Sequence, residues 1–162
     1  PGGPGVAGGE GAAANAAGSV ATMARDRDEA PVAGLLLIEP LLDPCMASAS
    51  SREASIGVGG CAIACGWQRY LARAADISHP YAAPAAAMRL TGLPPLLLVS
   101  VADSPLQDEG RRYAARLREA GVATDELVLP VDPRRTGWPD AATARVRGFL
   151  AASADAAPLT PR

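Results

Sequence analysis

The chain has 162 residues, of which 49% are hydrophobic and 20% charged, and its formal net charge is -2. A chain of this length can form one domain that buries about 70% of its unfolded surface. The small negative charge provides no field to attract nucleic acid or an anionic membrane, and no apolar run reaches the roughly 18 residues that a membrane span needs. We therefore expect one globular domain with neither nucleic acid nor a membrane as partner.

The cysteines indicate a reducing compartment rather than a disulfide framework. Their number is three, which is odd, and no secretory leader is recognised in the sequence, so we expect a cytoplasmic protein. Cys61 and Cys65 in "CAIAC" would share one face of a helix. Because no third and fourth ligands are near and the chain has a single histidine, we interpret them as buried small apolar residues. No metal and no cofactor is expected.

The first third of the chain predicts two strands around one helix. The Gly/Pro-rich start allows only a short, weak strand at about Gly5–Gly9. The stretch "AAANAAGSVATMARDR" is rich in helix formers and predicts a helix over about Ala12–Arg27. The apolar run Leu35–Ile38, stopped by Pro40, predicts a buried strand.

The middle of the chain is expected to be less regular. From Pro44 to about Gly60 the Ser, Ala and Gly content suggests an irregular excursion. The segment "CAIACGWQRYLARAAD" then has the spacing of an amphipathic helix, with Trp67, Tyr70 and Leu71 on or near one face. The following "SHPYAAPAAA" is expected to be a loop.

The last third predicts two more strands, each followed by a helix. Leu96–Val101 and about Glu126–Leu129 are the strands, and "PLQDEGRRYAARLREAGV" is the clearest helix, closed by Gly121. A final helix is expected at about Ala141–Ala152, before a flexible tail, residues 153–162. Strands that alternate with helices predict the α/β class, with a mainly parallel sheet flanked by helices on both faces.

Three stretches together resemble one known family. They are "MARDRDEAPVAGLLLIEPLLD", "WQRYL" and "HPYAAPAAAMRLTGLPPLLLVSVADSPLQDEGRRYAARLREAGV". In this order they resemble the C-terminal half of an α/β-hydrolase of the hormone-sensitive-lipase-like branch, which contains esterases and acetylhydrolases. The resemblance implies a partial α/β-hydrolase fold, strands five to eight, with a domain over residues 1–152 and a lid-side excursion over residues 44–88.

The resemblance also places the nucleophile elbow, a strained strand-to-helix turn written G-D-S-A-G-G-N in this family. Counted back from Met23 without a gap, the elbow lies on Gly9–Asn15, so Gly11 takes the position of the nucleophilic serine. Ala12 takes the position whose backbone N–H binds the oxyanion. Glycine has no side-chain oxygen, and nothing at this position can be acylated.

The acid and base positions of the implied triad also depart from the family. Ser104 stands where the family has its aspartate, and Asp103, one residue earlier, would point in another direction and is a poor substitute acid. Arg134 stands where the family has its histidine, and a guanidinium stays protonated and cannot accept a proton. The one histidine, His79, is expected to be exposed or structural, and Ser19 a small residue packed in the first helix.

About half of a family member has no counterpart in these residues, including the H-G-G-G segment that supplies further oxyanion donors. "PGGPG" is too short and lacks the histidine of that segment. The strand at Gly5–Gly9 would then form an open inner edge of the sheet. We expect self-association through this edge, or a separate chain that supplies the other half.

The sequence leaves several functions open. The interpretation we favour is an esterase/lipase-like protein that has lost catalysis, because Gly11, Ser104 and Arg134 hold the triad positions. One alternative is an active carboxylester hydrolase, completed by a partner chain or by a shifted site in which Asp103 or Asp132 supplies the acid. Another is a decayed fragment without a selected function.

A further alternative is a non-catalytic module that binds a small apolar molecule or a protein. Four aromatic residues could line its pocket: Trp67, Tyr70, Tyr81 and Trp138. Trp67 and Tyr70 on a helical face also fit a simple core. Arg134 and Arg135 could meet an acidic group, although such a pair is usually solvated surface.

Overall fold

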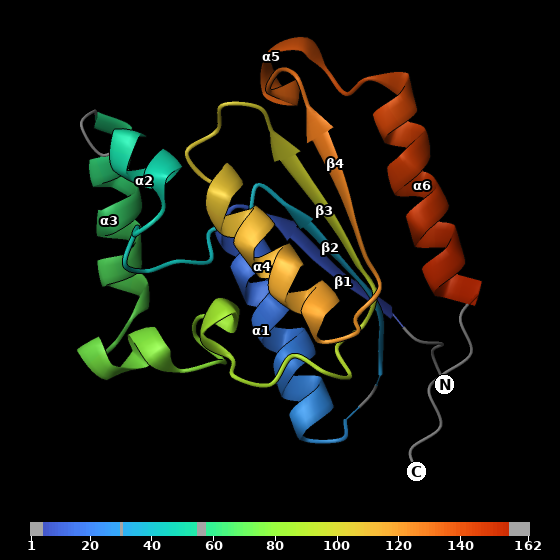
Figure 1. The fold of residues 1–162 in the computed structure, drawn as a ribbon, viewed down its shortest axis with the longest axis horizontal. Helices are drawn as coiled ribbons and strands as arrows, with labels where there is room; N and C mark the ends of the chain where they lie inside the picture. The colour runs from blue at the N-terminus through green and yellow to red at the C-terminus, as the bar shows by residue number, and fades with distance from the viewer. Residues whose placement is uncertain (1–4, 30, 55–57, 156–162) are drawn as a thin grey trace.

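The computed structural model describes residues 5–29, 31–54 and 58–155, and its centre is a four-stranded sheet in the order β1-β2-β3-β4 (Figure 1). All three neighbouring pairs are parallel. The strands are β1 (Gly5–Glu10), β2 (Val32–Ile38), β3 (Leu96–Val101) and β4 (Thr124–Leu129). The predicted α/β class is confirmed, and so are the four strands, of which β2 and β4 begin earlier than expected.

Helices cover both faces of this sheet. Helices α1 (Ala12–Asp26) and α4 (Gln107–Glu119) lie on one face, and α6 (Asp140–Asp155) lies on the other (Figure 1). Helix α1 connects β1 with β2 and α4 connects β3 with β4, because a parallel pair of strands needs a crossover connection. Helix α6 follows β4. The carboxyl ends of all four strands therefore lie at one edge.

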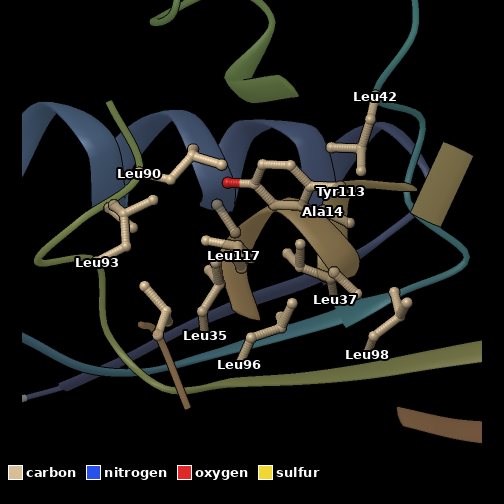
Figure 2. Packing of buried hydrophobic residues seen from close by; sticks show 14 of the residues in the cluster. Ala14, Leu35, Leu37, Leu42, Leu90, Leu93, Leu96, Leu98, Tyr113 and Leu117 are labelled. Atoms are coloured by element: carbon tan, nitrogen blue, oxygen red, sulfur yellow. The ribbon is translucent and has the colours of Figure 1, made fainter. Parts of the chain in front are cut away.

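The larger core lies between the sheet and helices α1 and α4. Figure 2 shows Tyr113 of α4 among leucines of β2 and β3, with Ala14 of α1 beside them. Small residues of α1 allow this helix to lie close to the strands: a Cβ built on Gly9 would come within 2.5 Å of the carbonyl carbon of Ala13. A second core cluster, on the other face, joins Leu97 and Leu129 to Ala142 of α6.

The segment between β2 and β3 is more helical than the sequence predicted. Residues 44–60 were expected to be irregular, but α2 (Ala49–Ala54) and the start of α3 (Val58–Tyr70) fall within them. One of the serines that suggested a loop, Ser48, instead caps α2, since its Oγ accepts a hydrogen bond from the N–H of Ser51 at 3.1 Å. The helix expected through residue 76 instead ends at Tyr70, and the short 3-10 helices η1 (Ala74–Ser78) and η2 (Pro84–Ala86) follow.

The C-terminal part confirms one expectation and corrects two. Gly121 follows α4 with φ +79°, and the N–H of Val122 reaches back to the carbonyl of Leu117 at 2.9 Å, as expected of a C-cap. A four-residue helix, α5 (Pro133–Thr136), was not predicted. The tail was expected from residue 153, but α6 continues to Asp155 because buried Ser153 packs against Gly34, while residues 156–162 lie outside the described residues.

Candidate active-site edge

The loops at the carboxyl edge of the sheet bring the three predicted triad positions into one neighbourhood. Gly11 follows β1, Ser104 follows β3 and Arg134 follows β4. Two glutamates lie at the same edge: Glu39 is hydrogen-bonded to Ser104, and Glu10 lies beside Arg134. In sheets of this kind, ligands bind outside the carboxyl ends of the strands.

Gly11 has the backbone of a sharp strand-to-helix turn. Its φ of 58° and ψ of -119° are strongly disfavoured for residues with a side chain. Both backbone groups are held, since the N–H of Gly11 donates to the carbonyl of Ile38 at 3.0 Å and its carbonyl accepts from Leu41 at 3.2 Å. A Cβ built on Gly11 meets nothing within 4 Å, so the direction in which a side chain would point is open.

Ala12, the predicted oxyanion position, is the first residue of α1. The first N–H groups of a helix have no partner inside the helix and carry the positive end of its dipole. No side chain caps this end of α1, and Ala12 is exposed. The N-terminus of α1 therefore presents N–H groups directly beside Gly11.

Ser104, the predicted acid position, is buried and bound to Glu39. Its hydroxyl donates to Oε2 of Glu39 and accepts from the N–H of Leu106 at 3.2 Å. The other carboxylate oxygen of Glu39 accepts from the N–H of Val101 at 2.7 Å. Burial raises the pKa of Glu39, and the hydrogen bonds from Ser104 and Val101 oppose this shift. The carboxyl group of Glu39 thus lies beside Ser104, the predicted acid position, which has no carboxyl group of its own.

Sequence reasoning missed Glu39. The available signal was a charged residue directly after the apolar run "LLLI", where the resembling family has a tyrosine. Its φ of +44° is uncommon for a residue with a side chain. Asp103, the substitute acid that was considered, also has a positive φ of 60°, but it is exposed whereas Ser104 is buried.

Arg134, the predicted base position, lies in α5 and is held by acidic neighbours. Its guanidinium Nη2 is 2.8 Å from Asp132 Oδ2, and its Nη1 is 3.7 Å from Glu10 Oε1. Hydrogen bonds to Asp132 raise the pKa of Arg134 above its already high ordinary value, and those from Arg134 lower the pKa of Asp132. Arg134 therefore remains a cation and Asp132 an anion.

The other singled-out residues lie away from this edge. Tyr81 contacts Asp26 and Arg27 at the far end of α1, and exposed His79 stacks edge-on against Tyr81. Ser19 is buried within α1, as expected. Cys65 is exposed, which corrects the expectation that it is buried, because the helix face that carries it is turned outward; the side chain of Cys61 lies outside the described residues.

Two cavities lie beside the edge, and none of the four predicted aromatic residues lines either one. Trp67 is buried against Tyr70, whereas Trp138 is 39% exposed. The first cavity, of about 370 Å³, lies between α4 and the segment before β3; its walls include Leu42, Ile77, Ala83, Ala86, Arg112 and Tyr113. The second, of about 360 Å³, is more polar and is lined by Asp103, Ser104, Ser50, Glu53, Gln107 and Asp108.

A parallel sheet with a strained strand-to-helix turn at its carboxyl edge matches the arrangement of the nucleophile elbow in α/β-hydrolases. A family model described as alpha/beta hydrolase fold matches residues 5–131. The chain belongs to the α/β-hydrolase family, and the solved structures similar to it include bacterial esterases, in agreement with the hormone-sensitive-lipase-like branch that the sequence resembles.

Three of these structures illustrate the similarity. Esterase LipW from Mycobacterium marinum is 30% identical, with a TM-score of 0.75 over 91% of this chain and 48% of its own. The hyperthermophilic esterase from the archaeon Pyrobaculum calidifontis is 28% identical, with a TM-score of 0.74 over 90% and 50%. A bacterial heroin esterase is 29% identical, with a TM-score of 0.74 over 90% and 49%. This chain thus spans about half the length of these esterases.

No curated protein matches the chain. Within the described residues, no helix is long and apolar enough to cross a membrane.

Proposed function

We propose that this chain is a non-catalytic member of its esterase-like family. The observation that carries the proposal is Gly11, which holds the elbow backbone but has no side-chain oxygen to attack an ester. Arg134 supports it, because a cation held by Asp132 and Glu10 cannot take a proton from a nucleophile. In related chemistry, loss of the nucleophile or base costs on the order of a million-fold in rate.

Hydrolysis of p-nitrophenyl butyrate, run beside a serine-reactive phosphonate label with mass detection, tests this proposal. We expect neither turnover above the buffer rate nor a labelled residue. Turnover together with one labelled residue would overturn the proposal and identify a shifted site.

A double variant serves as the matched comparison. Gly11→Ser with Arg134→His places a hydroxyl on the elbow and an imidazole at the base position, with Glu39 left in place as a carboxylate. We expect the phosphonate to label position 11 in this variant and to label nothing in the unaltered chain. Labelling elsewhere in the variant would show that the elbow was placed wrongly.

The first cavity favours a second role, the binding of a small apolar molecule. Its walls carry alanine, leucine and isoleucine side chains together with the charged groups of Asp43, Glu109, Arg112 and Arg116, and its volume of about 370 Å³ fits a small ligand. We expect 1-anilinonaphthalene-8-sulfonate to fluoresce on binding here, and Ala86→Leu, which fills part of the cavity, to weaken that signal. Ala144→Leu, an exposed position on α6, is the control; equal binding by both variants contradicts this role.

A further inference from the structure

The first cavity joins a buried apolar wall to an exposed mouth. Leu42 and Tyr113 of the main core lie on its wall, and both are almost completely buried (Figure 2). We call the exposed residues that line it the mouth: Cys45, Ala47, Ile77, Ser78 and Arg112. All residues that line the cavity come from the part of the chain between Leu42 and Arg116. The wall suits the apolar part of a ligand, so the charged groups beside it decide which head group the cavity accepts.

One side of α4 supplies most of these charged groups. Glu109, Arg112, Tyr113 and Arg116 are three or four residues apart along the helix, and all four line the cavity. Residues with this spacing are neighbours on one side of a helix. Helix α4 therefore carries two guanidinium groups and one carboxyl group beside the same cavity.

The two carboxyl groups of the cavity already accept hydrogen bonds from the backbone. The oxygens of Asp43 accept from the N–H groups of Cys45 at 2.9 Å and Ala47 at 2.8 Å. Those of Glu109 accept from the N–H groups of Leu42 and Asp43, each at 3.1 Å. Burial raises the pKa of Glu109 to about 7, so this group loses much of its negative charge at neutral pH. A cationic ligand would find both acidic groups occupied.

The two arginines, by contrast, have no carboxylate partner among the described residues. The Nη2 of Arg116 donates to the carbonyl of Ala87 at 2.6 Å and its Nη1 donates to that of Ala85, which holds η2 against α4. Arg112 makes neither a hydrogen bond nor an ion pair with any described residue. Like charges one helical turn apart repel each other, and an anion beside them would relieve that repulsion.

On the basis of the binding role proposed above for the first cavity, we propose that its ligand is an amphipathic anion, a small molecule with an apolar body and one carboxylate head group. The body lies against Leu42, Ala86 and Tyr113, and the head group lies at the mouth beside Arg112. A neutral molecule of the same shape gains only the apolar contacts. A cationic one is repelled by Arg112.

Isothermal titration calorimetry with three eight-carbon probes tests this preference. The probes are octanoate, 1-octanol and octylamine, which share an apolar chain and differ in the charge of the head group. We expect octanoate to bind about fivefold more tightly than 1-octanol, the range of an exposed ion pair. Octylamine should bind most weakly.

Two arginine variants assign the preference to the mouth. Arg112→Gln removes the charge at the cavity and should lower the affinity for octanoate to that for 1-octanol. Arg111→Gln is the matched control, because Arg111 is the exposed neighbour on the same helix and does not line the cavity. This variant has the same net charge as the first and should bind octanoate like the unaltered chain.

Alkylation of the cysteines shows where the probe binds. Cys45 and Cys65 are both exposed, and only Cys45 lines the cavity. Saturating octanoate should slow the reaction of Cys45 with iodoacetamide and leave that of Cys65 unchanged, as measured by peptide mass spectrometry.

Each of these measurements can overturn the proposal. Equal affinity for octanoate and 1-octanol, or tighter binding of octylamine, removes the preference for an anion but leaves the apolar binding role intact. No binding of any probe contradicts both. Equal weakening by the two arginine variants, or a Cys45 that octanoate does not protect, shows that the anion binds elsewhere. None of these results depends on whether the chain hydrolyses esters.

Discussion

Glu109 is the buried carboxyl group that ties α4 to the loop after β2. Its two oxygens accept hydrogen bonds from the N–H groups of Leu42 and Asp43, each at 3.1 Å. Burial raises the pKa of Glu109 to about 7, and those two hydrogen bonds only partly oppose the shift. The folded chain therefore binds a proton here more tightly than the unfolded chain does.

This shift predicts that stability falls as pH rises. Because the folded pKa lies above the unfolded one, the contribution is complete below about pH 4.5 and is lost by about pH 7, at up to about 1.4 kcal/mol per pH unit. Urea unfolding at several pH values measures it. Glu109→Gln should flatten the dependence in this window while costing about 1 kcal/mol for one lost hydrogen bond; an unchanged slope would contradict the assignment.

The contact between Glu39 and Ser104 predicts a change in one pKa. Ser104→Ala removes a hydrogen bond that favours the charged carboxylate, so the pKa of Glu39 should rise further. A pH titration of the glutamate carboxyl carbons by NMR follows this group. Ser100→Ala, at a buried serine of β3 whose hydroxyl has no partner among the described residues, should leave the pKa of Glu39 unchanged.

At the scale of elements, the turn from β1 into α1 depends on a close contact at Gly9. An added Cβ would lie 2.5 Å from the backbone of Ala13, so Gly9→Ala must push the helix from the strand. We expect a loss of about 1–3 kcal/mol in the free energy of unfolding, measured in urea. Gly5→Ala in the same strand meets nothing within 4 Å and should cost much less; equal losses would argue against the contact.

Two glycines with open surroundings, Gly121 after α4 and Gly148 within α6, should respond in opposite directions to substitution by alanine. Gly121 has φ +79° after α4, so Gly121→Ala should destabilise by about 1 kcal/mol. Gly148 lies within α6 and its added Cβ meets nothing, so Gly148→Ala should stabilise by up to about 1 kcal/mol. Thermal unfolding of both variants checks the pair, and a shift of the same sign in both would contradict it.

The sequence was informative about elements whose signals are local. Apolar runs bounded by proline or glycine predicted β2 and β3, because a buried strand needs several adjacent apolar residues. Gly121 predicted the end of α4, because a left-handed cap favours glycine. Helix α2 was missed because its serines fit both a loop and a cap. Glu39 was missed because its partner Ser104 is 65 residues away along the chain, and no local pattern encodes that contact.

At the scale of the whole molecule, the chain covers about half of the esterases that it matches, yet it has a complete four-stranded sheet with helices on both faces.

The backbone at Gly11 also affects how easily a nucleophile could return to this position by mutation. The difficult part of an elbow is its strained turn, and this chain retains that turn with free space where a side chain would project. Glycine and serine codons can differ by a single nucleotide. A hydroxyl could therefore return to this position in one mutational step, whereas an imidazole in place of Arg134 would first have to displace a cation that Asp132 and Glu10 hold.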